Sequence, residues 1–173
     1  MHKLEVIDAN GYIVFWTTQF VVSEPLFKMT SPNYNAVKYT TEIEVAKSAD
    51  AVFNHLLHDV AKFWPEDFEG ESSKLNDEFL FTTGGGSHYS KNKVVELAHN
   101  EKVVWLVTES RRKTDNFDWT GTKMIFELTH KGDHTLLQFT FDGIILEGEY
   151  DRLVQICDLV IKEMLYNYIS HSD

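Results

Sequence analysis

The sequence is poor in cysteine and has no long uninterrupted apolar run. Its single cysteine, Cys157, excludes an intramolecular disulfide and fits a reducing compartment. The most apolar stretch, residues 11–22, is interrupted by Thr17, Thr18 and Gln19, and it falls short of the roughly 20 residues that cross a bilayer. We therefore expect a cytoplasmic protein that does not enter a membrane.

Basic residues are also scarce. Lysine and arginine total 16 against 27 acidic residues, so the net charge is -11. This balance disfavours nucleic acids and anionic membranes, because both are bound mainly through lysine and arginine. The one basic cluster, Arg111-Arg112-Lys113, is interpreted as an exposed hairpin turn. With 43% hydrophobic and 13% aromatic residues, the chain has enough apolar material for one globular domain.

The usual motifs of catalysis and cofactor binding are missing. No serine lies in a Gly-x-Ser-x-Gly elbow. His55 and His58 have no third ligand at a telling spacing, so no metal is expected. Residues 84–86 are three glycines without the Lys-Ser/Thr of a phosphate-binding loop, which disfavours a nucleotide but suits a lid. We expect no cofactor and a binding protein rather than an enzyme.

The first 35 residues differ from the rest. Two strand-like runs, Leu4–Ile7 and Tyr12–Phe15, flank an Asn-Gly pair that favours a hairpin. Met29–Asn33 is instead typical of the residues just before a domain, so residues 1–28 are interpreted as an upstream extension. We predict a weakly ordered extension over residues 1–35 and one domain over residues 36–173.

From residue 36 the pattern is regular. Val37–Val45 alternates like a strand, and Ser48 is the expected N-cap of a helix over Ala51–His58. A long amphipathic helix is expected from Glu149 to Ser170. Short turns between the intervening strands predict an α+β fold with an antiparallel sheet. Those strands are Ser72–Leu75, Glu78–Thr83, Lys91–Ala98, Lys102–Ser110, Trp119–His130 and Thr135–Gly143.

Alternation within the late strands and the helical period select one apolar set that faces the space between sheet and helix. Glu96, between Val95 and Leu97, is the one acid expected to be partly buried. Tyr168 and Glu96 are the expected polar contacts that would orient a ligand. A filled core and a ligand cavity both satisfy this pattern. The candidate cavity residues are Trp105, Met124, Phe126, Leu137, Phe139, Phe141, Cys157, Ile161, Met164 and Tyr168.

Several segments together resemble the START-like, or SRPBCC, superfamily, and most closely its bacterial branch related to the activator of the heat-shock protein 90 ATPase. The resemblance covers residues 37–169. The segments that carry it begin at Tyr39 (YTTEIEV), Ser48 (SADAVF), Phe63 (FWP), Lys102 (KVVW), Trp119 (WTGTKMIFEL) and Thr135 (TLLQFTFDG).

The resemblance implies a helix-grip fold, in which a curved antiparallel sheet of six or seven strands wraps a long C-terminal helix over a hydrophobic cavity. It also implies one of three roles: uptake of a small hydrophobic or aromatic molecule, binding of a protein partner such as a chaperone ATPase, or cyclase- or hydrolase-like catalysis in the cavity. Phe141 occupies a position where the family often has histidine, which makes that end of the cavity more apolar. The eukaryotic activators carry an additional N-terminal domain that has no counterpart here.

Overall fold

The computed structural model describes residues 5–7, 13–17, 20–24, 33–64, 67–113 and 118–172, with the first three ranges described as backbone only. The chain divides into two compact units, residues 1–32 and 33–173. In the first unit, β2 (Ile13–Thr17) pairs antiparallel with both β1 (Glu5–Ile7) and β3 (Phe20–Glu24). The Asn10-Gly11 pair lies outside the described residues. The weak order of residues 1–35 and the boundary at residue 36 stay predictions.

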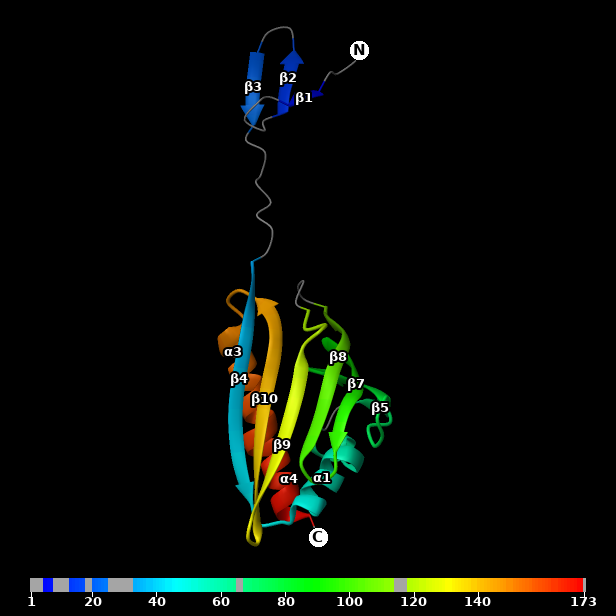
Figure 1. Ribbon diagram of the computed structural model, residues 1–173. Coiled ribbons are helices and arrows are strands. Elements are labelled where there is room, and N and C mark those ends of the chain that lie inside the picture. Colours follow the sequence, from blue (N-terminus) through cyan, green and yellow to red (C-terminus); the bar gives the residue numbers. More distant parts are fainter. Residues whose placement is uncertain are drawn as a thin grey trace. The chain divides into compact units, whose positions relative to one another are not determined.

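The second unit is built on a curved sheet of seven antiparallel strands, in the order β4-β10-β9-β8-β7-β6-β5 (Figure 1). Successive strands from β5 to β10 are neighbours in the sheet, and β4 forms the other edge beside β10. The predicted α+β fold is confirmed. The strands are β4 (Tyr34–Val45), β5 (Phe68–Gly70), β6 (Glu78–Thr83), β7 (His88–Ala98), β8 (Lys102–Arg112), β9 (Lys123–Lys131) and β10 (His134–Leu146).

One predicted strand is wrong. Ser72–Leu75 forms a bend before β6 rather than a strand. The carboxylate of Asp77 accepts hydrogen bonds from the Lys74 backbone N–H at 2.8 Å and the Ser73 hydroxyl at 3.3 Å. Asn76 adopts a positive φ of 73°, which asparagine tolerates in turns. Local side-chain hydrogen bonds thus replace sheet pairing here.

A helical segment of 22 residues covers one face of this sheet (Figure 1). It consists of α3 (Tyr150–Asp158), a π-helical segment η1 (Leu159–Leu165) and α4 (Tyr166–His171). Its buried stripe includes Leu153, Cys157, Ile161, Leu165 and Ile169, and these meet the inward residues of the strands in one core. The predicted helix-grip arrangement is therefore confirmed.

Two short helices close one end of the core. α1 (Ala49–His58) begins at Ser48, whose hydroxyl accepts a hydrogen bond from the Ala51 backbone N–H at 3.2 Å, so the predicted N-cap is confirmed. α2 (Val60–Phe63) follows and brings Trp64 into the core.

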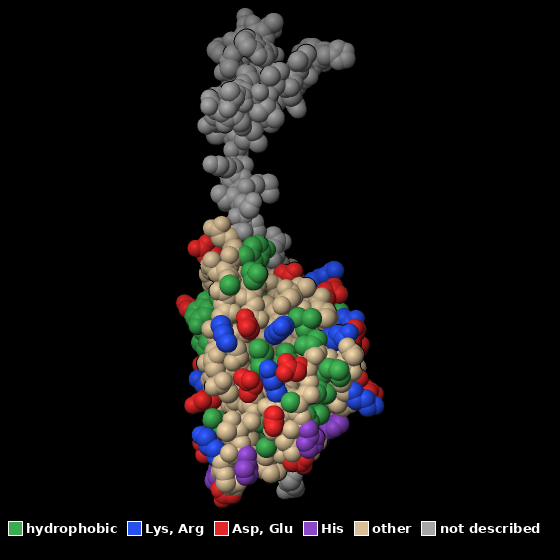
Figure 2. Space-filling view, viewed as in Figure 1, with side chains coloured by type: hydrophobic (Ala, Val, Ile, Leu, Met, Phe, Trp, Pro, Cys, Tyr) green, Lys and Arg blue, Asp and Glu red, His purple; other side chains and the backbone are tan. Residues whose placement is uncertain are grey.

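The outer face of the sheet carries charged side chains of both signs among hydrophobic ones (Figure 2). Figure 2 shows acidic and basic side chains interspersed over it. Lys102, for example, lies between Glu96 and Glu127, at 3.2 and 3.9 Å from their carboxylates. The inner face is apolar and packs against the helix, so the space between the two layers is enclosed mainly by apolar side chains.

Candidate functional site

A cavity of about 280 Å³ lies between the sheet and the C-terminal helix. Strands β6 to β9 supply one wall, and α3 with η1 supplies the opposite wall. Trp64 and Trp119 complete the lining from the segments next to these elements. The remaining lining residues are Phe81, Thr83, Gly84, His88, Ser90, Val107, Met124, Arg152, Ile156, Leu159, Val160 and Met164.

Aromatic side chains give the cavity firm walls. The rings of Trp64 and Phe81 lie 4.3 Å apart between centroids. Trp119 makes edge-to-face contacts with His88 at 5.3 Å and with Phe141 at 5.4 Å. Such contacts fix ring orientation, because the positive edge of one ring meets the negative face of another. The walls therefore present flat apolar surfaces in set directions.

His88 is the main polar group inside the cavity. Its Nε2 lies 3.0 Å from the hydroxyl oxygen of Ser110, and the side chain is buried. Desolvation lowers the pKa of His88, and the nearby charge of Arg112 lowers it further. The imidazole is consequently neutral near pH 7, and it suits a polar but uncharged group on a ligand.

Arg112 lies at the end of β8 with its side chain only 6% exposed. Its Nη2 is 3.4 Å from Oε1 of Glu149, the residue before α3. This contact joins the sheet to the start of the long helix beside the cavity. The prediction that residues 111–113 form an exposed turn is wrong for Arg112, because residue alternation turns it inward while Arg111 remains exposed.

The predicted site residues are all in or against the core, but they fall into separate groups. Met124 and Met164 line the cavity. A second, much smaller space of about 30 Å³ is lined by Met124 together with five other predicted residues. Trp105 and Leu137 are fully buried in the packed core. Besides Met124, the predicted residues that line this small space are Phe126, Phe139, Phe141, Cys157 and Ile161.

Tyr168 lies away from the cavity, at the α1 end of the helix. Its ring contacts His55 at 5.4 Å and Phe63 at 6.2 Å between centroids. It is partly buried, and burial together with a hydrogen bond to Asp59 raises its pKa. Tyr168 thus belongs to a polar cluster with His55 and Asp59.

The expected partial burial of Glu96 is wrong. The carboxylate is 51% exposed and pairs with Lys102 on the outer face. A β-bulge explains the difference: Val94 pairs with Trp105 and Glu96 with Val104, so Val95 is an extra residue. The bulge shifts the alternation by one position, turns Glu96 outward and leaves Leu97 packed against the core.

Most residues of the cavity wall were not predicted from the sequence. In several segments, alternation alone did not show which side chains point inward. The cavity residues in these segments are Trp64, Phe81, Trp119 and Arg152. His88 had a signal, because it follows the triple glycine that was interpreted as a possible lid. Those glycines have positive φ values of 61°, 64° and 77° and form the turn between β6 and β7. Gly84 itself lines the cavity.

Within residues 33–64, 67–113 and 118–172, no group of three or more histidine, cysteine or acidic side chains is placed to hold a metal ion. None of the helices in the described part of the chain combines the length and apolarity needed to cross a membrane.

The fold was compared with known proteins. No family model and no curated protein matches the sequence. Among solved structures, a protein from Rhizobium leguminosarum has a TM-score of 0.69 at 11% identity, with 83% of this chain and 100% of that chain covered. The Aha1 dimer from Colwellia psychrerythraea has a TM-score of 0.62 at 20% identity, with 78% and 97% covered.

A plant protein has the same architecture. The major latex-like protein 151 from Panax ginseng has a TM-score of 0.59 at 14% identity, with 77% of this chain and 97% of that chain covered. At these identities the likeness concerns the fold alone. The predicted helix-grip fold is thus confirmed.

Proposed function

We propose that this protein binds a small apolar or aromatic molecule in the cavity between its sheet and its C-terminal helix, without chemical conversion. The supporting observation is a cavity of about 280 Å³ whose walls include Trp64, Phe81 and Trp119. Close packing is the normal state of a protein interior, so an open space of this size needs a reason. Ligand sites commonly combine apolar walls with a few polar groups, as this cavity does.

The volume restricts the class of ligand. Sites for drug-sized molecules usually measure about 300–1,000 Å³, so this cavity is at the lower end. A compact molecule of one to three rings fits such a space better than a long acyl chain. The flat aromatic walls favour planar rings, and His88 and Ser90 supply polar groups for one hydroxyl or carbonyl.

A neutral fluorescent probe tests this proposal. N-phenyl-1-naphthylamine fluoresces more strongly in apolar surroundings, so we expect saturable enhancement on titration with the full chain. Ile156→Trp adds a ring to the helix wall of the cavity and is expected to weaken probe binding at least tenfold. Ile156 lines the cavity, so the larger side chain is expected to occupy part of its volume.

The matched control is Ile144→Trp. Ile144 is 59% exposed on β10, so the same substitution there adds a ring to solvent. We expect its probe affinity and thermal midpoint to equal those of the unmodified protein. Equal binding by the Ile156→Trp protein, or no saturable binding by the unmodified protein, would contradict the cavity as a binding site.

The other two roles implied by the sequence predict different results. A protein-partner module needs no free cavity, so blocking the cavity by Ile156→Trp would leave partner binding intact. An enzyme that works in the cavity would consume its ligand, whereas a binding protein releases it unchanged. Recovery of a bound molecule before and after incubation, followed by mass spectrometry, separates these cases.

A further inference from the structure

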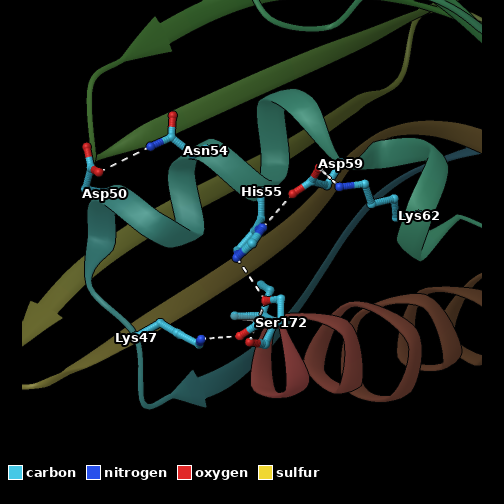
Figure 3. Close-up of polar contacts among 8 residues, drawn as sticks. Lys47, Asp50, Asn54, His55, Asp59, Lys62 and Ser172 are labelled. Atoms are coloured by element: carbon cyan, nitrogen blue, oxygen red, sulfur yellow. Dashed lines mark hydrogen bonds and ion pairs between the residues drawn. The ribbon is translucent and has the colours of Figure 1, made fainter.

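A Ser–His–Asp arrangement lies where the end of the C-terminal helix meets α1 (Figure 3). The hydroxyl oxygen of Ser172 is 3.0 Å from Nε2 of His55. Nδ1 of the same ring is 2.6 Å from Oδ2 of Asp59. A nucleophile, a base and a group that orients the base are recognised by this geometry and not by their positions in the sequence.

Asp59 is held in its ionised form. Burial by itself raises the pKa of its carboxyl group, but hydrogen bonds from Lys62, His55 and Tyr168 together lower that pKa below its ordinary value. Lys62 Nζ lies 2.7 Å from Oδ1, the oxygen that does not face His55. An ionised carboxylate beside Nδ1 keeps the proton of a neutral imidazole on Nδ1, which leaves Nε2 free to accept one from Ser172.

The surroundings of Ser172 include a cation at its backbone and a second acceptor for its hydroxyl proton. Lys47 donates a hydrogen bond from Nζ to the Ser172 carbonyl oxygen (Figure 3). The Lys47 carbonyl is in turn held by the Thr135 hydroxyl at 2.8 Å. The Ser172 hydroxyl also lies 3.0 Å from the Ile169 carbonyl, which gives its proton a second acceptor. Ser172 is partly exposed and His55 is 13% exposed, so solvent reaches the pair.

We propose that Ser172, His55 and Asp59 form a reactive-serine site that hydrolyses small activated acyl esters. His55 Nε2 takes the hydroxyl proton as Ser172 Oγ attacks the ester carbonyl carbon. The bond to the leaving oxygen breaks, and that oxygen takes up the proton. Water, activated by the same nitrogen, then hydrolyses the acyl-serine and releases the carboxylic acid. The Lys47 ammonium is the nearby charge that favours the oxyanion.

The substrate class follows from the position of the site. The lining of the cavity between sheet and helix includes neither Ser172 nor His55. Because the pair lies outside that cavity and solvent reaches it, we expect a short, activated ester as the substrate. This activity is separate from ligand uptake, because neither residue contacts the cavity between sheet and helix.

Two measurements on the full chain test this site. Treatment with phenylmethylsulfonyl fluoride, followed by peptide mass spectrometry, is expected to place the sulfonyl group on Ser172. Hydrolysis of p-nitrophenyl acetate is expected to fall at least tenfold in Ser172→Ala. Ser170→Ala removes an exposed hydroxyl from the same helix end and should retain both the labelling and the rate. An unmodified Ser172 in the unmutated protein would overturn the assignment without any variant.

Asp59 acts through His55, so its test needs a readout beyond the rate. Asp59→Asn is expected to lower the rate and to change its dependence on pH, since the neutral amide no longer stabilises the protonated ring. His55→Gln should abolish labelling while keeping a side chain that can contact Ser172. If Ser172→Ala lowers only the thermal midpoint and the rate is unchanged, Ser172 is a helix cap and the proposal is wrong.

Discussion

Gly143 lies in β10 at a point where another part of the backbone comes very close. A Cβ atom placed on it would lie 2.3 Å from Thr122 Cγ2 and 2.9 Å from Thr122 Cα. Thr122 is fully buried, and its backbone is hydrogen-bonded to Val107 and Trp119, so it cannot move away easily. Glycine is thus required here by space and not by an unusual φ angle.

We predict that Gly143→Ala lowers the free energy of unfolding by about 1–3 kcal/mol, the usual cost of overpacking. Urea denaturation followed by tryptophan fluorescence measures the change. Adding Thr122→Ser removes the nearest atom and should restore only part of the loss, because the new methyl group still meets the Thr122 backbone. Full stability in Gly143→Ala alone would contradict this close approach between β10 and the Thr122 segment.

Single residues were predictable where only alternation mattered. Met124, Phe126, Phe139 and Phe141 are all buried, as the two-residue period of their strands indicated. Their contact with a ligand stays a prediction. His55 shows the limit of such reasoning, since its partner Ser172 lies 117 positions away. Only the folded chain brings the two residues together.

At the scale of elements, α1 offers a clean test of local structure. The hydroxyl of Ser48 satisfies one of the backbone N–H groups that a helix leaves open at its start. We predict that Ser48→Ala costs about 1 kcal/mol of stability. Ser48→Asp should cost little, because its carboxylate can accept the same hydrogen bond and interacts well with the helix dipole. Chemical denaturation of both variants provides the comparison, and equal losses would rule out capping as the cause.

The order and type of the elements followed from the sequence, but their irregularities did not. The long helix was predicted over Glu149–Ser170, and the structure has helical elements from Tyr150 to His171. Its π-helical part, Leu159–Leu165, lines the cavity through Leu159, Val160 and Met164. A π turn and the bulge at Val95 each shift a register by one residue. Regular periods of 3.6 and 2 do not encode such shifts, so Glu96 was given the wrong side.

At the scale of the whole molecule, the cavity was the hardest feature to place. The sequence predicted a space between sheet and helix, and the structure has one. Its position, however, depends on how all the side-chain volumes add up. The large residues at the centre, such as Trp105 and Phe126, fill that region, with ring centroids 4.7 Å apart. The remaining volume lies toward β6 and β7, where His88 and Ser90 line the cavity.

The joint between helix and sheet also determines how the molecule responds to alkaline pH. Tyr39 on β4 hydrogen-bonds to Asp158 on α3, and burial with this contact raises the pKa of Tyr39 from 10.0 to about 12. Burial, with the Asp158 charge, raises the pKa of the neighbouring Cys157 from 9.0 to about 12. Both groups therefore keep their protons in the folded protein at pH values where the unfolded chain has lost them.

Because the unfolded chain then binds fewer protons, the free energy of unfolding must fall as the pH rises above about 9 and continue to fall until the folded pKa values are reached. Lysine ion pairs contribute with the same sign, so single variants are needed to isolate each group. Cys157→Ala should remove the part of the loss that starts near pH 9, and Tyr39→Phe the part that starts near pH 10. Urea midpoints at pH 8, 9, 10 and 11 give the slopes. If the free energy of unfolding of the Cys157→Ala protein falls as steeply between pH 8 and 10 as that of the unmodified protein, the thiol is not buried between helix and sheet as described.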